Sequence, residues 1–168
     1  LSVGVLQNMA TDTDACREIV SQGGIEQIVG AMKQHSEDAG VQRRCCAALG
    51  NLASTDEYRA RIAECGGSKA ILDATQRFAT HTDVQQRGMN VLNNLATHPG
   101  QAARIAEAGG VATLLGILAQ NNADAQGVKL SVGVLQNMAT DTDACREIVS
   151  QGGIEQIVGA MKQHSEDA

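Results

Sequence analysis

Apolar and polar residues along this chain follow the spacing of amphipathic helices, and the pattern recurs every 43 residues. Residues 13–21 (TDACREIVS) predict a short helix that begins at a Thr/Asp cap. Residues 25–34 (IEQIVGAMKQ) predict a second helix, because their apolar side chains fall at i, i+3, i+4 and i+7 on one face. Residues 41–53 (VQRRCCAALGNLA) predict the longest and most buried helix. Each 43-residue unit is therefore expected to hold three helices.

Two sequence features recur at the same position in every 43-residue repeat. Each predicted first helix has one apolar anchor at the same position: Ile19, Ile62, Ile105 and Ile148. A glycine pair follows each anchor, at 23–24, 66–67, 109–110 and 152–153. The pair is expected to end the helix and permit a sharp turn, because glycine adopts positive φ freely. In the third copy, Pro99 falls in the first helical turn, where proline is tolerated.

Residues 1–39 and 130–168 are identical, at an offset of 129 residues, which is three repeat lengths. Neighbouring repeats, in contrast, differ at most positions. Gradual divergence would not leave both patterns in one chain. Two explanations stay open: a window on an array of identical 129-residue blocks, or an engineered periodic chain.

Three helices per 43 residues, a glycine pair after the first and an ALxNLA-type close to the third resemble the armadillo repeat. The closing motifs are AALGNLA (Ala47–Ala53), NVLNNLA (Asn90–Ala96) and GVLQNMA (Gly4–Ala10 and Gly133–Ala139). A HEAT repeat, the alternative, has a similar length but two helices and lacks these markers. The resemblance implies an all-α, right-handed solenoid. It divides the chain into a third helix (1–10), three complete repeats (11–53, 54–96, 97–139) and two further helices (140–168).

Composition narrows the classes of partner. Nineteen acidic and thirteen basic side chains give a net charge of −6, which disfavours nucleic acid and anionic membranes as partners. Tyr58 and Phe78 are the only aromatic residues, so the stacking platforms that usually bind single-stranded nucleic acid are missing. No apolar run of about 18 residues occurs, so no membrane span is expected.

The candidate chemistry for catalysis is weak, and we expect no enzyme, no metal site and no cofactor. The five cysteines show no CxxC or His–Cys spacing. They are expected to be reduced and packed as small apolar residues in a cytosolic or nuclear protein, with a redox role as the alternative. Gly66–Lys69 (GGSK) lacks the spacing of a phosphate-binding loop and is interpreted as a repeat junction.

One asparagine recurs at the same position in every predicted third helix, although Asn is a poor helix former. In armadillo proteins the third helices line a concave groove, and this Asn pairs with the backbone of an extended peptide. The resemblance implies that role for Asn8, Asn51, Asn94 and Asn137. One side-chain amide offers both a donor and an acceptor, which matches one peptide unit. The alternative is that each Asn bonds the backbone of a neighbouring repeat and holds the stack together.

We expect the residues four and eight positions before each Asn, on the same helix face, to select the side chains of a bound peptide. Nuclear import adaptors of this family carry Trp four residues before. Here that position holds Gly4, Ala47, Asn90 and Gly133, which argues against their mode of binding basic peptides. The residues eight positions before are Arg43, Gln86 and Lys129. Together with Arg44 and Arg87 they would suit an acidic or mixed peptide, or they form a solvated helix start.

The sequence therefore predicts a non-enzymatic scaffold that binds an extended segment of a partner protein along its groove. The alternative is a structural element that stacks head to tail. Both ends are expected to leave an apolar face uncovered: Val3, Val5 and Leu6 at the start, and Ile154, Ile157, Val158 and Met161 at the finish. Arrays normally cover such faces with polar capping repeats. Docking one copy onto the next would be a heterologous contact, which closes into a ring or extends into a fibre.

Overall fold

The computed structural model describes residues 3–98, 100–119 and 125–163, and these residues form twelve helices. No strand occurs among them, and the predicted all-α class is confirmed. Pro99 lies outside the described residues. The helices are α1 (Val3–Met9), α2 (Thr13–Ser21), α3 (Gly24–Gln34), α4 (Ala39–Leu52), α5 (Asp56–Glu64), α6 (Gly67–Arg77), α7 (Thr82–Ala96), α8 (Gln101–Glu107), α9 (Gly110–Leu118), α10 (Ala125–Met138), α11 (Thr142–Ser150) and α12 (Gly153–Gln163).

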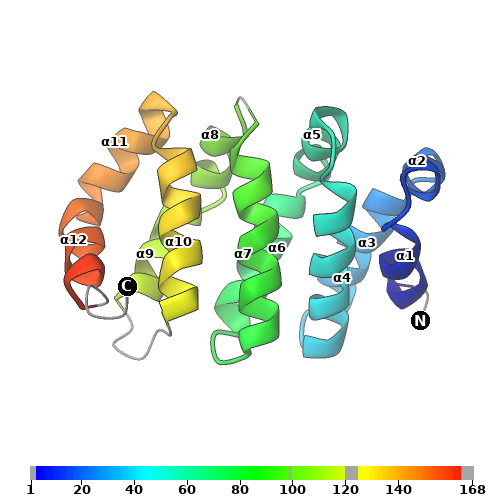
Figure 1. The fold of residues 1–168 in the computed structure, drawn as a ribbon, viewed down its shortest axis with the longest axis horizontal. Coiled ribbons are helices and arrows are strands. Elements are labelled where there is room, and N and C mark those ends of the chain that lie inside the picture. Colours follow the sequence, from blue (N-terminus) through cyan, green and yellow to red (C-terminus); the bar gives the residue numbers. More distant parts are fainter. Residues whose placement is uncertain (1–2, 99, 120–124, 164–168) are drawn as a thin grey trace.

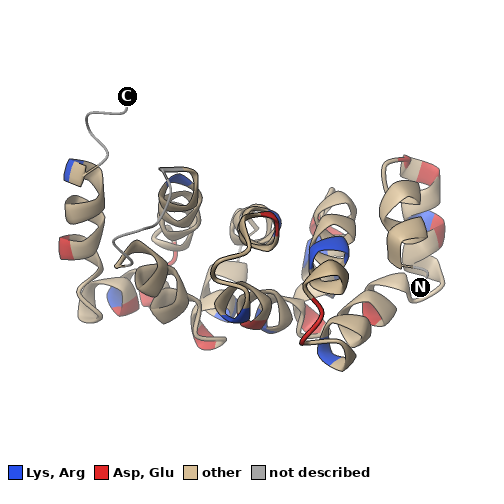
Figure 2. Ribbon diagram, turned by 90° about the horizontal axis from the view of Figure 1, so that it is seen from below, with Lys and Arg blue, Asp and Glu red and all other residues tan. Residues whose placement is uncertain are grey.

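The helices stack side by side into a curved array of three rows (Figure 1). The first helices, α2, α5, α8 and α11, lie along one edge. The second helices, α3, α6, α9 and α12, form the back row, and the third helices, α1, α4, α7 and α10, form the front row. Turned by 90°, the array is an arc with the third helices on its inner side (Figure 2). This inner side is the concave face.

The core runs between the three rows and consists of aliphatic side chains. The third helices contribute fully buried leucines such as Leu49, Leu52, Leu92 and Leu95. Neighbouring third helices pack against one another, and α4, α7 and α10 also pack against the second helices of their own repeats, α3, α6 and α9. Burial of one such side chain stabilises the fold by roughly 1.5–3 kcal/mol. The row of third helices is therefore held in place from two sides.

The two glycines of each pair have different physical tasks. The first adopts the left-handed conformation, with a φ of 74° at Gly23 and 82° at Gly66. The second opens the next helix directly against the anchor isoleucine. A Cβ atom at Gly67 would lie 2.6 Å from the carbonyl oxygen of Ile62. The same close approach recurs at Gly24, Gly110 and Gly153. The pair therefore sets both the direction and the closeness of the second helix.

A buried glutamine ties the second helix to the third in two repeats, a contact that was not predicted from the sequence. The Nε2 atom of Gln42 donates to the carbonyl oxygens of Met32 and His35, both at 2.9 Å. Gln85, at the same repeat position, makes the two equivalent bonds at the end of α6. The third repeat has Val128 at this position.

We expect Gly67→Ala to destabilise the chain and Gly30→Ala to leave it unchanged or slightly more stable. At Gly67 the new methyl group would meet a backbone oxygen, and forcing extra volume into a packed site costs roughly 1–3 kcal/mol. At Gly30, inside α3, no atom lies within 4 Å of an added Cβ, and alanine favours a helix over glycine by roughly 0.5–1 kcal/mol. Urea unfolding followed by circular dichroism measures both changes. Equal stabilities of the two variants would contradict the close approach at Gly67.

Candidate functional site

The concave face carries a hollow of about 350 Å³ between α4 and α7, which we call the inner hollow. Its lining residues are Cys46, Ala47, Gly50 and Asn51 from α4, and Arg87, Asn90, Val91 and Asn94 from α7. The two helices approach closely here, because a Cβ atom at Gly50 would lie 3.4 Å from Cγ2 of Val91. Small side chains thus leave space on this face, and three amides and one guanidinium surround it.

The asparagine ladder predicted from the sequence lies on the row of third helices. Asn8, Asn51 and Asn94 are exposed, and Asn137 is half-buried. Asn90, one helical turn before Asn94, is also exposed. The inner hollow brings three of the predicted binding residues, Asn51, Asn90 and Asn94, to one place.

Two ladder amides bond the preceding third helix. The Nδ2 atom of Asn51 donates to the backbone carbonyl oxygen of Gln7 at 3.1 Å. The Nδ2 atom of Asn137 donates to the side-chain oxygen of Asn93 at 2.9 Å. The side chain of Asn94, in contrast, makes no hydrogen bond to any other residue that the structure describes. The ladder therefore contains two amides that link repeats and one, that of Asn94, that lines the inner hollow with no partner among the described residues.

The residues eight positions before the ladder do not line the inner hollow. Arg43 and Gln86 are half-buried and Lys129 is exposed, all in the first half of their helices. The positively charged residue that lines the inner hollow is Arg87, one position after Gln86 on α7. Since each residue turns an α-helix by about 100°, a shift of one position moves a side chain to another part of the surface. Arg44 is exposed, and its Cδ lies 3.8 Å from a Cβ built at Gly4 of α1.

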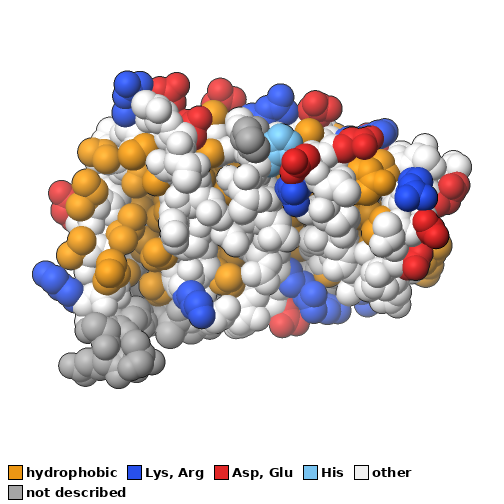
Figure 3. Space-filling view, turned by 45° about the horizontal axis from the view of Figure 1, so that its top comes forward, with side chains coloured by type: hydrophobic (Ala, Val, Ile, Leu, Met, Phe, Trp, Pro, Cys, Tyr) orange, Lys and Arg blue, Asp and Glu red, His pale blue; other side chains and the backbone are white. Residues whose placement is uncertain are grey.

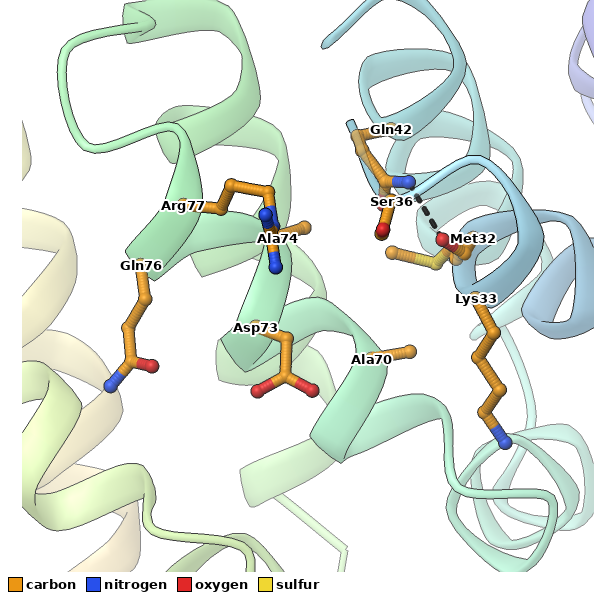
Figure 4. A pocket seen from close by; sticks show the side chains of 9 residues that line it. All are labelled: Met32, Lys33, Ser36, Gln42, Ala70, Asp73, Ala74, Gln76 and Arg77. Carbon is orange, nitrogen blue, oxygen red and sulfur yellow. Dashed lines mark hydrogen bonds between the residues drawn. The ribbon is translucent and has the colours of Figure 1, made fainter. Parts of the chain in front are cut away.

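A second hollow, of about 450 Å³, lies on the outer side between α3 and α6 (Figure 4). Its charged groups already have partners. Asp73 pairs with Lys69, and Arg77 pairs with Glu37. Gln42, on its wall, is bound to the backbone of α3. The inner hollow is therefore the better candidate site, although the outer hollow is larger.

Two buried thiols lie at the inner hollow: Cys46 lines it, and Cys45 precedes Cys46 on α4. Burial raises the pKa of Cys46 to about 12 and that of Cys45 to about 11. All five cysteines are free, and Cys16, Cys45 and Cys46 are buried. A thiol that stays protonated is a poor nucleophile, so the surroundings of Cys45 and Cys46 do not favour the redox alternative.

Two further features of the described residues bear on function. They contain no group of His, Cys, Asp and Glu side chains that could hold a metal ion. Within residues 3–98, 100–119 and 125–163, no helix has the length and apolar character needed to cross a membrane.

Apolar side chains are exposed at both ends of the array. Figure 3 shows such side chains gathered over α11 and α12. The exposed residues there are Val149, Ile154, Val158 and Met161, and those on α1 are Val5 and Met9. The other predicted end residues are half-buried: Val3, Leu6 and Ile157. The structure thus adds Met9 and Val149 to the residues that the sequence singled out.

Comparison with known proteins identifies one family and several similar folds. The family described as "Protein zer-1 homolog-like, C-terminal domain" matches residues 3–168. A crystal structure of an engineered protein superposes with a TM-score of 0.83 at 30% identity, over 95% of this chain and 64% of that chain. A second engineered protein gives 0.81 at 31% identity, over 93% and 38%. A designed armadillo repeat protein in complex with the peptide (KR)4 gives 0.73 at 18% identity, over 95% and 62%. The chain thus spans less than two thirds of each of these proteins, and no curated protein matches it.

We expect the chain to lose stability as the pH rises above about 9, because Cys46 keeps its proton in the folded state. Its pKa is about 12 when folded, against an ordinary value of 9.0, so the unfolded chain releases the proton first. The stabilisation is complete below pH 9.0 and is lost towards pH 12, at up to roughly 1.4 kcal/mol per pH unit. Urea unfolding of the wild type and of Cys46→Ala, at mildly and strongly alkaline pH, measures the loss. An equal decline in both proteins would contradict the assignment to Cys46.

Proposed function

This chain belongs to the family of protein zer-1 homolog-like C-terminal domains and is built of armadillo repeats, and we propose that its concave groove binds an extended segment of a partner protein. The role is that of a scaffold, without catalysis. The five free cysteines, three of which are buried, support a place in the reducing cytosol or nucleus.

The observation that carries this proposal is the pair of amides beside the inner hollow, Asn90 and Asn94, whose side chains form no hydrogen bond to another residue that the structure describes. An extended peptide presents one N–H and one C=O group per residue, and each must find a partner when water is displaced. A side-chain amide supplies both a donor and an acceptor. Packed helices lie roughly 10 Å apart and an extended chain advances about 3.3 Å per residue, so one amide per repeat meets the peptide about every third residue.

The known structures support the same function at the level of the fold. One designed armadillo repeat protein of this fold is in complex with a peptide. Its identity to this chain is 18%, so it supports the capacity of the solenoid to hold a peptide and carries no information on which peptide.

We expect Asn94→Ala to weaken peptide binding by roughly 1 kcal/mol or more with little change in stability, because its amide has no partner to lose inside the protein. Asn51→Ala should weaken binding and also lower the melting temperature, because its bond to the Gln7 carbonyl is removed. Peptides selected from a phage-displayed library of random linear sequences serve as probes, with calorimetry for affinity and thermal melting for stability.

Gln27→Ala is the matched control, since it removes an exposed amide from the second helix α3. Gln27→Ala should change neither the affinity for the selected peptides nor the melting temperature. Selected peptides that bind Asn94→Ala as tightly as the wild type would contradict the groove, and so would a library that yields no binder at all.

A second candidate function is head-to-tail association of this 168-residue chain, and a comparison within the chain favours it. Helices α11 and α12 repeat the sequences of α2 and α3. In α3, which packs against α4 and α6, Ile25 is 0% exposed and Met32 is 2% exposed. Their copies in α12, Ile154 and Met161, are 55% and 63% exposed. The first copy thus shows what kind of surface covers this face: the third helix of the same repeat and the second helix of the next.

The other end of the chain offers such a helix. In α1, Val5 is 58% exposed and Met9 is 45% exposed, while their copies in α10, Val134 and Met138, are fully buried. We propose that α1 of a second copy covers α12 as α4 covers α3. The likeness to engineered repeat proteins also supports an engineered origin of the exact duplication.

One pair of charges opposes this docking. Within the chain, Glu26 of α3 accepts a hydrogen bond from Arg61 of the next repeat at 2.7 Å. A second copy in the same register would place Glu18 where Arg61 stands, opposite Glu155. Like charges at this contact weaken the association, so it should be moderate and should tighten with salt or with Glu18→Arg.

We expect the wild-type chain to associate with rising concentration, and Val5→Asp and Val158→Asp each to prevent this by placing a charge in an apolar contact. Each variant keeps one intact end, so an equimolar mixture of the two should form a dimer and nothing larger. Sedimentation velocity over the micromolar range measures these states. A wild type that stays monomeric throughout would exclude the contact, and a mixture that stays monomeric would exclude the head-to-tail arrangement.

A further inference from the structure

We propose that the concave groove selects an extended segment rich in aspartate and glutamate, one of whose carboxylates occupies the inner hollow beside Arg87. This inference rests on the proposed peptide-binding function and names the class of peptide that the groove takes.

Charge is distributed unevenly between the rows of helices. The chain as a whole has nineteen acidic and thirteen basic side chains. The third helices carry one acidic residue, Asp83, and four basic ones: Arg43, Arg44, Arg87 and Lys129. Figure 2 shows Lys and Arg positions in blue along the row of third helices. The row of third helices is therefore positive in a protein that is otherwise negative.

The cations of the third helices also lack the carboxylate partners that other cations have. Six ion pairs occur among the described residues, and every one lies on first helices, second helices or the loop after α3. Arg87 and Asp83 stand one turn apart on α7 and form no ion pair. A guanidinium exposed to water is free to bind a carboxylate of a ligand, with two parallel hydrogen bonds. Four of the cations outside these ion pairs, Arg43, Arg44, Arg87 and Lys129, lie on the third helices, and Arg87 lines the inner hollow.

The inner hollow offers hydrogen-bond donors and no negative charge. Its polar lining consists of Arg87 and the amides of Asn51, Asn90 and Asn94, and it contains no Asp or Glu. A carboxylate accepts hydrogen bonds at both oxygens and donates none. Asn51 uses one N–H group on the Gln7 carbonyl, and its second N–H group remains for a ligand. A carboxylate in this hollow would therefore have a charged partner and neutral donors around it.

Other ligands meet this surface less well. A lysine-rich or arginine-rich segment would bring like charges against Arg87 and its neighbours on the concave face. A nucleic acid supplies anions but also bases that need aromatic surfaces for stacking. Tyr58 lies on α5 and Phe78 at the end of α6, away from the third helices. An acidic peptide is the class of ligand that complements the positive charge of Arg87 and needs no aromatic surface for stacking.

The test uses three fluorescent peptides of equal length, in which serine alternates with glutamate, with glutamine or with lysine. Alternation is chosen because every second side chain of an extended peptide points the same way. Fluorescence anisotropy with the 168-residue chain should show the glutamate peptide binding roughly tenfold or more tightly than the glutamine peptide, because hydrogen bonds to charged groups are the stronger class. This preference should shrink at high salt.

Arg87→Gln should weaken the glutamate peptide roughly tenfold and leave the glutamine peptide unchanged. Arg87→Glu should go further and improve binding of the lysine peptide, a gain that damage to the fold would not produce. Arg17→Gln is the matched control, since it removes an exposed cation from the first helix α2 and should change no affinity. Thermal melting of each variant monitors the fold.

The outcomes separate this inference from the proposed function. Equal binding of the glutamate and glutamine peptides would overturn the charge selection and leave peptide binding intact. Binding of none of the three would overturn both. Equal losses in Arg17→Gln and Arg87→Gln would assign the effect to overall charge rather than to the hollow. A single-stranded oligonucleotide that binds as tightly as the glutamate peptide, and depends equally on Arg87, would overturn the choice of a peptide.

Discussion

The contact between the second glycine of each pair and the carbonyl oxygen of the anchor isoleucine is the constraint on which this array depends. A Cβ atom at Gly67 or Gly24 would come within 2.6 or 2.7 Å of that oxygen. Only glycine allows the second helix to begin so close to the first. Because the contact recurs in each repeat, each second helix leaves its first helix in the same way. The third helices then fall into one row, and the row forms the groove. The geometry of the concave face is thus determined by glycine contacts between the first and second helices, which lie away from that face.

Much of this fold could be predicted because its markers recur along the sequence with a fixed period of 43 residues. The glycine pairs, the anchor isoleucines and the recurring asparagine all keep one register, so the helices were placed to within one or two residues. The close approach of the second glycine was not predicted, because glycine was expected there only for its backbone freedom. The tie made by Gln42 and Gln85 was also missed. Its signal was present: a glutamine at one repeat position in two copies of an apolar helix.

The site was harder to predict than the fold, because it depends on details that a period does not contain. The ladder residues were placed on the third helices, but the bond from Asn51 to Gln7 requires the distance between two repeats. Arg87 was named only as a neighbour of the expected position, since one residue along a helix changes the face. The identical segments 1–39 and 130–168 show that the burial of a residue also depends on more than its local sequence. Ile25 and Ile154 have the same local sequence and opposite exposure, because neighbouring repeats decide burial.

The glutamine tie has a mechanical consequence. In two repeats the last turn of the second helix is fastened to the third helix by two directional bonds, at Gln42 and at Gln85. In the third repeat Val128 offers only apolar contact, which resists sliding far less than a hydrogen bond with fixed geometry. We therefore expect the first two repeats to hold the angle between their second and third helices more rigidly than the third repeat does. The inner hollow lies between the third helices of those two repeats, so the residues that line it are carried by the most firmly braced part of the array.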